Sequence, residues 1–204
     1  MFYTGGDKIK ISIEHYKNMT IEEALVKIKK DLSNYVIELG VISGISEERR
    51  DMVQIGVTNA DLMFIHEYGS PVNNVPPRPV LQMAIDYTRE ELLDKYLDKA
   101  IDAYLKNFNI KDFENVINRL CNAIQRYAKK IIYDNDGRLK ENAPSTAYQK
   151  GKKALKDNSD LRREYNKIET KSGRRKFIEE QGNHPLFDTG NLARSIVCRL
   201  RKIN

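Results

Sequence analysis

One short motif near the C-terminus carries residues that can perform acid–base chemistry. Asp188, Thr189 and Gly190 form an Asp-Thr-Gly triplet, which can supply one carboxylate of a pair that shares a proton. That chemistry needs two such carboxylates, and the chain holds a single triplet, so a dimer would be required. The next residues, 191–195, are polar and helix-like. We therefore expect Asp188 or Thr189 to cap a helical turn, with Gly190 permitting a close backbone approach.

The pair His66 and Glu67 is a second place where reactive side chains lie close in sequence. Adjacent residues of a helix point about 100° apart, so the two side chains do not form one site. We interpret one of them as a structural hydrogen-bonding group near a helix end. Three histidines in the whole chain are too few and too scattered for a zinc site. Cys121 and Cys198 are far apart in sequence and are expected to be reduced thiols.

Other catalytic patterns are absent from the sequence. It contains no GxxxxGK[ST], no GxGxxG and no HExxH motif. Acidic residues of the segment 86–102 recur at helical spacing, but Lys95 and Lys99 are interspersed with them. That mixture favours a solvated helix face over a divalent-metal site. The sequence thus predicts no enzyme activity, no metal and no cofactor.

Apolar residues at spacings of three and four predict the helices that position these residues. Thr20 and Glu23 form a capping box at the first helix, and Asn59 is expected to cap the second, which stops at Gly69. The third is unusually long, so a break near Thr88 is expected. These helices are predicted at 20–32, 60–68, 79–107 and 112–131.

Alternating apolar and polar residues predict the strands. The second and third strands are separated by a polar segment that contains a glycine, which indicates a hairpin with a mobile tip. The predicted fold class is α+β, with a small, mostly antiparallel sheet, helices packed on one face, and a basic extended arm or insertion. The strands are predicted at 7–13, 35–42, 52–58 and 196–203.

Composition and charge divide the 204-residue chain. Hydrophobic residues make up 40% of it, enough for a core. The sequence contains no run of about 18 apolar residues, so we expect no membrane-spanning helix. The N-terminus lacks the pattern of a signal peptide. The formal net charge is +6, yet residues 1–137 carry 18 basic and 21 acidic residues, whereas 138–182 carry 13 and 7. We expect an α+β core at 1–137, a basic arm at 138–182 that orders poorly alone, and a turn and strand at 183–204 that complete the core.

The basic segment 138–182 supports one function by charge alone. Its cations are interleaved with Tyr148, Tyr165 and Phe177, a pattern that suits a nucleic acid or an acidic protein face. A nucleic-acid-binding module is therefore the alternative function, and a solvated surface without a partner is the other interpretation. The candidate polyanion-binding residues are Lys150, Lys152, Lys153, Arg162, Arg163, Arg174, Arg175 and Lys176.

Two segments in a fixed order carry a family resemblance. The first is ADLMFIHEYGS at 60–70, followed by PPRPVL at 76–81, and the second is HPLFDTGNLARSI at 184–196. Together they resemble the tail-completion or head–tail joining proteins of tailed bacteriophages. Pro144-Ser145-Thr146 and Lys150-Gly151 match a further family segment loosely. The stretch from about 152 to 183 is longer than this family leads us to expect.

The resemblance implies a non-enzymatic virion protein of the phage neck. Its copies would form a ring, typically six-fold, between the head connector and the tail tube or tail terminator, with DNA in transit and no membrane. Assembly would take place in the host cytoplasm. A ring requires two different faces on each subunit. Arg78 suits a carboxylate on a neighbour or, within the chain, a salt bridge to the sheet or to Glu67. The residues implied in assembly are His66, Glu67, Tyr68, Gly69, Pro77, Arg78, Pro79, Asp188, Thr189, Gly190 and Leu192.

Overall fold

A computed structural model describes residues 20–42, 57–186 and 190–203. The described residues form two compact units. The first unit contains 20–39, 84–125 and 198–203, and the second contains 40–42, 57–83, 126–186 and 190–197. The boundaries between the units fall inside two helices and near one end of each strand.

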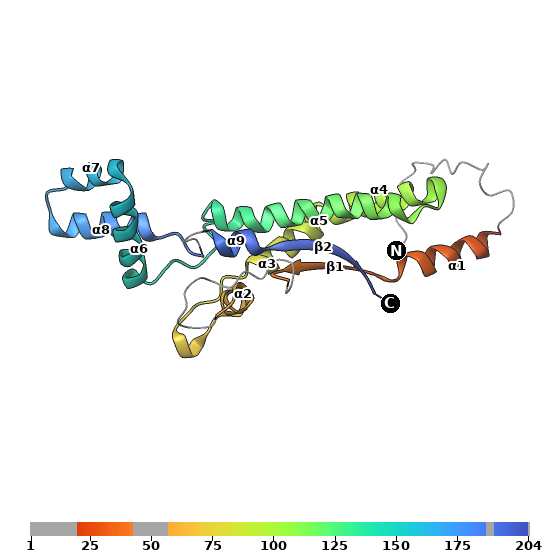
Figure 1. Cartoon of the computed structure of the whole chain (residues 1–204), viewed down its shortest axis with the longest axis horizontal. Helices are drawn as coiled ribbons and strands as arrows, with labels where there is room; N and C mark the ends of the chain where they lie inside the picture. Colours follow the sequence, from red (N-terminus) through yellow and green to blue (C-terminus); the bar gives the residue numbers. More distant parts are fainter. Residues whose placement is uncertain (1–19, 43–56, 187–189, 204) are drawn as a thin grey trace. The chain divides into compact units, whose positions relative to one another are not determined.

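The predicted α+β class is wrong. The described part of the chain is 69% helical, and its sheet has only two strands, β1 (Tyr35–Gly40) and β2 (Val197–Lys202). Figure 1 shows the two strands side by side and antiparallel, and Ile203 N donates to Asn34 O at 2.6 Å beyond their ends. The predicted strand 7–13 and residues 52–56 of the predicted strand 52–58 lie outside the described residues. The strands predicted at 35–42 and 196–203 are confirmed.

The extended basic arm predicted at 138–182 is also wrong, because this segment is mainly helical. It contains α6 (Pro144–Asp157), α7 (Ser159–Lys167) and α8 (Lys171–Gly182). Each begins with a local start signal: Pro144 is at the first position of α6, and Asn158 and Thr170 accept backbone N–H groups at the starts of α7 and α8. Because apolar residues are scarce in this segment, the helical periodicity was weak and the sequence predicted an extended arm.

The first unit is built on two whole helices, the larger parts of two others, and the two strands. Its helix α1 (Ile21–Leu32) begins at the predicted box, where Thr20 Oγ1 accepts from Glu23 N at 3.2 Å and Glu23 accepts from Thr20 N at 2.7 Å. The long helix expected at 79–107 is two helices, α3 (Val80–Glu91) and α4 (Leu93–Asn107). The break is therefore at Leu92, one turn beyond the predicted position.

Helix α5 (Ile110–Tyr133) is the longest helix of the described chain and supplies core residues to both units. The apolar spacing predicted for this helix is confirmed, since Phe113, Leu120, Ile124 and Ile131 are buried, while Val116 and Tyr127 of the same stripe are half-buried. The helix begins slightly earlier than expected. In the first unit, Tyr104 is fully buried and its hydroxyl donates to Asp31 at 2.7 Å.

Two ionisable residues of β1 are held by partners in the same unit. The Tyr35 hydroxyl donates to Glu114 at 2.6 Å, and burial together with this carboxylate raises the pKa of Tyr35 to about 12. Glu38 accepts from Arg199 at 2.8 Å and also from Arg201, both on β2. These two hydrogen bonds lower the pKa of Glu38. The single Glu38 carboxylate and the two guanidinium groups thus join the strands through side chains as well.

The second unit begins with α2 (Asn59–Tyr68), whose cap was predicted wrongly. Thr58, not Asn59, is the N-cap: its hydroxyl accepts from Asp61 N, and Asp61 accepts from Thr58 N, which is a reciprocal capping box. Asn59 is the first helical residue and is buried. A short 3-10 turn (Pro71–Asn73) and the isolated bridge between Ser70 and Val75 shape the loop that follows.

Helices α6 and α8 approach each other closely because glycines lie between them. A Cβ added to Gly151 would lie 1.8 Å from Ile178 O, and one added to Gly182 would lie 1.8 Å from Ala147 O. Ala147, Gly151, Ile178 and Gly182 are all buried. Figure 1 shows α6 running across α8. Backbone proximity thus orders a segment that has few large apolar side chains.

Candidate functional site

Glu67, near the C-terminal end of α2, caps another helix. Its carboxylate oxygens accept hydrogen bonds from Leu81 N at 2.9 Å and Gln82 N at 2.8 Å, the second and third N–H groups of α3. These donors have no partner inside their own helix, and a negative charge is favourable at a helix N-terminus. Glu67 therefore fastens the C-terminal end of α2 to the beginning of α3.

Gly69 and Pro77 bring the intervening loop back onto α2. Gly69 ends the helix with φ of 79°, a conformation that favours glycine. A Cβ at this position would lie 3.0 Å from both Pro77 N and Val75 O. Arg78 N then donates to His66 O at 2.6 Å. The backbone contact places Pro79 directly before α3, whose first turn is closed by the hydrogen bond from Met83 N to Pro79 O at 3.0 Å.

The Arg78 side chain is buried within its own unit, the second one. It is only 5% exposed, and it donates from Nε to Lys140 O at 2.7 Å and from Nη2 to Glu141 O at 2.8 Å. Burial lowers the pKa of its guanidinium. Both hydrogen-bond acceptors are backbone carbonyls, whereas the sequence suggested a carboxylate of Glu67 or of a neighbouring subunit. Arg78 thus stabilises the turn before α6.

The C-terminal motif lies against the first motif. Asp188 and Thr189 are outside the described residues. Gly190 is buried and has φ of 77°, and it precedes the short helix α9 (Asn191–Ser195), which packs against α2. Leu192 of this helix is 2% exposed. The two segments that are distant in sequence therefore meet within one unit.

A hollow of about 680 Å³ lies among residues from both motifs and from α6. It is open to solvent, and no acidic side chain of the described residues lines it. His66 is the one imidazole in this lining, so the lining provides no pairing of an imidazole with a carboxylate. The hollow brings together several residues that the sequence analysis had assigned to two different functions: His66, Arg78, Lys150, Lys153 and Leu192.

Tyr68 is part of an exposed apolar patch. It is 70% exposed, and its ring centre lies 4.9 Å from that of Phe64, which is 64% exposed. Val72, in the 3-10 turn that follows α2, is 92% exposed. Of the residues implied in assembly, Tyr68 is thus directed to solvent, whereas Glu67 and Arg78 bind backbone groups.

Several of the basic residues of 138–182 already bind groups of the same chain. Lys150 Nζ donates to His184 O at 3.2 Å, and Arg174 Nε donates to Ile168 O at 2.7 Å. Arg163, Arg175 and Lys176 form ion pairs with Asp160, Glu179 and Glu180, respectively. Lys152 Nζ lies 5.3 Å from the ring centre of Tyr148, a cation–π distance. These side chains thus have partners within the chain, Arg163, Arg175 and Lys176 are still largely exposed, and the polyanion surface stays a prediction.

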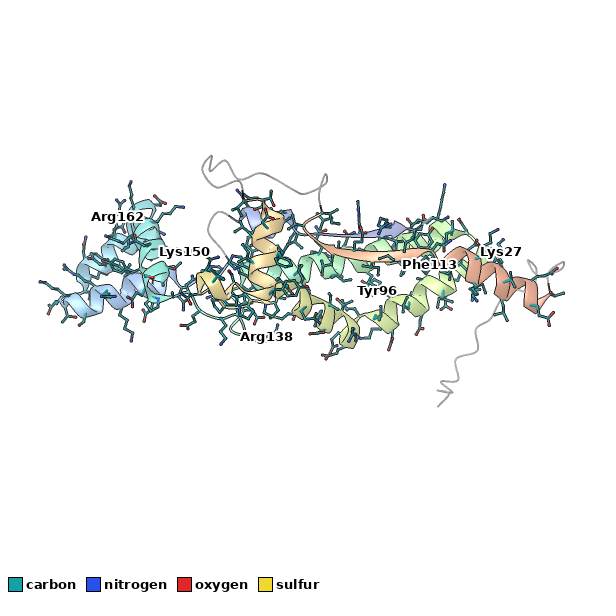
Figure 2. All side chains as sticks on the ribbon, turned by 90° about the horizontal axis from the view of Figure 1, so that it is seen from below. Lys27, Tyr96, Phe113, Arg138, Lys150 and Arg162 are labelled. Atoms are coloured by element: carbon teal, nitrogen blue, oxygen red, sulfur yellow. The ribbon has the colours of Figure 1, made fainter. Side chains whose placement is uncertain are left out.

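A second hollow, of about 420 Å³, lies over α6, α7 and α8. Lys152, Lys156 and Arg162 line it, and all three side chains are exposed. Leu155 and Ile178, which are 8% and 4% exposed, form its apolar lining. Figure 2 labels Arg162 and Lys150 on these helices. We call the exposed surface of Lys152, Lys156 and Arg162 the cationic face.

The two cysteines form a pair that the sequence analysis missed. Cys121 of α5 and Cys198 of β2 are buried, reduced and joined by a hydrogen bond between their thiols. This bond lowers the pKa of Cys121 and raises the pKa of Cys198. Their separation of 77 positions leaves no local motif, so only the periodicity of the helix and the strand, which places both on buried faces, could have suggested the contact.

The described ranges contain no further sign of a cofactor or a membrane segment. Nowhere in them do three or more His, Cys, Asp or Glu side chains group so as to hold a metal ion. No helix within 20–42, 57–186 and 190–203 is long and apolar enough to cross a bilayer. Comparisons of the chain with protein-family models, curated proteins and solved structures find no match.

Proposed function

We propose that this chain is a structural protein of the neck of a tailed bacteriophage. Its copies form a ring that completes the tail and joins it to the head connector, as a tail terminator or head–tail joining protein does. The proposal includes a virion location and no enzymatic activity. Its basis is the order of the two motifs at 60–81 and 184–196, since the α+β fold expected from the resemblance is not the fold of the described chain.

The way in which Glu67 and Arg78 are used agrees with a structural role for the first motif. The Glu67 carboxylate binds the start of α3, and the Arg78 guanidinium binds the carbonyls of Lys140 and Glu141. Polar side chains that are occupied in this way hold a scaffold together and are not available as reactive groups. The motif residues thus support a rigid subunit, which is what a ring component requires.

The exposed surfaces support the same proposal. A ring subunit needs exposed surfaces that contact its neighbours, and the second unit has two of them: the neighbouring exposed rings of Phe64 and Tyr68, and the cationic face. Exposed apolar residues grouped together are typical of protein-binding surfaces.

The experiment is co-expression of the chain with the connector and tail proteins encoded by the neighbouring genes. The expected result is a ring seen by electron microscopy, with a mass that is a multiple of 23.6 kDa and with co-purification on tails. A chain that stays monomeric with every neighbouring virion protein, and that is absent from purified particles, contradicts the proposal.

A further inference from the structure

The cationic face combines positive charge with an apolar centre. Lys152 and Lys156 are four residues apart on α6, so they lie on one side of the helix, and Arg162 joins them from α7. Leu155 lies between the two lysines and lines the hollow of about 420 Å³ that the three cations surround. No acidic side chain of the described chain lines this hollow. Its occupant must therefore bring anionic groups and an apolar group together.

Helix α4 carries an exposed surface with the opposite properties. Asp94, Asp98 and Asp102 recur every four residues and are all exposed. Ile101 lies beside them, three residues after Asp98, and is 38% exposed although it is a large apolar side chain. Lys95 and Lys99 are also exposed, and each lies three residues before an aspartate of this stripe, so they border it on the side opposite Ile101. We call Asp94, Asp98, Ile101 and Asp102 the acidic face.

The two faces match in spacing as well as in charge. Lys152-x-x-Leu155-Lys156 on α6 corresponds to Asp98-x-x-Ile101-Asp102 on α4. In both helices the charged residues are separated by four positions and enclose an apolar residue one position before the second charge. Four residues of an α-helix rise about 6 Å, so both ammonium groups can meet carboxylates at once. Ile101 then enters the hollow over Leu155 and Ile178.

From this complementarity we propose that the cationic face binds the acidic face of a second copy of this chain. The contact joins two different surfaces, and in a head-to-tail arrangement it is heterologous and propagates into a closed ring or an open filament, whereas a reciprocal arrangement closes a dimer. It would be the subunit contact of the ring proposed above, but it rests on charge and spacing and is tested without virion proteins. Because its ion pairs are exposed at the rim, the association weakens as salt rises.

The test uses two charge reversals in the full chain. The first variant is Lys152→Glu with Lys156→Glu, and the second is Asp98→Lys with Asp102→Lys. Each alone places like charges across the contact, so each is expected to weaken self-association at low salt by about 100-fold. Sedimentation equilibrium or mass photometry gives the dissociation constant, and circular dichroism reports whether helical content is retained.

Mixing the two variants gives the decisive result. The acidic α6 of the first variant complements the basic α4 of the second, and the two unmodified faces complement each other. A mixture in equal amounts is therefore expected to regain association close to that of the wild type. Restoration only when all four substitutions are in one chain would indicate a contact within the chain, and would overturn the proposal.

Matched reversals elsewhere separate this contact from a general charge effect. Lys167→Glu with Lys171→Glu, and Glu90→Lys with Glu91→Lys, change the net charge equally at exposed positions outside the two faces. Both controls are expected to change the dissociation constant less than about threefold. If a reversal on a face lowers the helical content, the neutral pair Lys152→Gln with Lys156→Gln replaces it, with an expected loss of about tenfold.

Three outcomes overturn the proposal. They are a wild-type chain that does not self-associate at low salt, a mixture that is not restored, and controls that weaken association as strongly as the face variants. Salt-dependent binding of DNA that Lys152→Glu with Lys156→Glu abolishes, while self-association is unchanged, assigns the face to a nucleic acid instead. A restored mixture combined with absence from virions retains the contact and rejects only the proposed neck function.

Discussion

Two regions of the second unit hold polar residues in opposite ways. In the segment 66–81, Glu67 and Arg78 bind backbone N–H and carbonyl groups of the same chain. On helices α6 and α7, Lys156 and Arg162 are exposed around an apolar hollow. The first region uses charge for internal hydrogen bonds, and the second is held together by close backbone packing and leaves its charge at the surface.

This difference shows how to separate residues that build a fold from residues that meet a partner. A buried guanidinium with two carbonyl acceptors contributes to stability, because its loss leaves polar groups without partners. An exposed cation contributes little to stability. Substitutions in the two regions should therefore differ in their effect on the free energy of unfolding, and the following predictions test that difference.

The largest effect is expected for Gly151→Val, which tests whether backbone packing orders α6 and α8. A Cβ at this position would lie 1.8 Å from Ile178 O and 2.7 Å from Ile178 C, so the helices must separate. We expect a loss of about 3 kcal/mol or more in the free energy of unfolding, since overpacking of this kind is costly. Urea unfolding followed by circular dichroism measures it.

Gly137→Val is the matched control, because nothing lies within 4 Å of a Cβ at Gly137. Its expected change is within about 0.5 kcal/mol. If Gly151→Val were as mild as this control, close packing would not be what holds the basic helices, and the contrast between the regions would be lost.

The next largest effect is expected for Arg78→Met, which keeps much of the side-chain volume and removes both hydrogen bonds. The carbonyls of Lys140 and Glu141 then lose their guanidinium donor, at a cost of about 2 kcal/mol. Arg162→Met makes the same chemical change on the exposed region, where about 0.5 kcal/mol or less is expected. Equal losses in the two variants, measured by urea unfolding, would contradict the comparison.

A smaller effect is expected for Glu67→Ala. The second and third N–H groups of α3, at Leu81 and Gln82, lose their acceptor, which costs about 1 kcal/mol, the usual worth of a cap. Glu67→Gln retains one acceptor oxygen and should lose less. Glu90→Ala, an exposed carboxylate near the other end of the same helix, serves as the control. Hydrogen exchange at Leu81 and Gln82 should quicken only when Glu67 is changed.

The sequence predicted the features that depend on neighbouring residues. The box of Thr20 and Glu23 needs only two residues three positions apart, and the buried stripe of α5 needs only a regular spacing. The cap of α2 was assigned one residue late, because Thr58 and Asn59 are both good caps and the reciprocal bond of Asp61 decides between them.

The features that depend on distant residues were not predictable from one sequence. The carbonyl partners of Arg78 lie 62 and 63 positions away. Every residue has a backbone carbonyl, so the residue type does not indicate which one accepts the hydrogen bond. The contact of Gly151 with Ile178 likewise has no local pattern, so the basic segment was expected to be extended. In the candidate site, the sequence identified Glu67, Tyr68 and Arg78 as candidates. Which of these side chains is buried and which is exposed could be seen only in the structure.

The smallest effect is expected for Lys156→Ala, and its smallness is informative. Lys156 is exposed on α6, beside the apolar hollow and near other cations, so its removal relieves repulsion and loses no buried contact. The free energy of unfolding should change by less than about 0.5 kcal/mol at low salt, and by even less when salt screens the remaining charges. A loss of about 2 kcal/mol would mean that this cation holds α6 in place, as Arg78 holds its own turn. An unchanged stability with altered self-association would instead assign the residue to the surface that meets a partner.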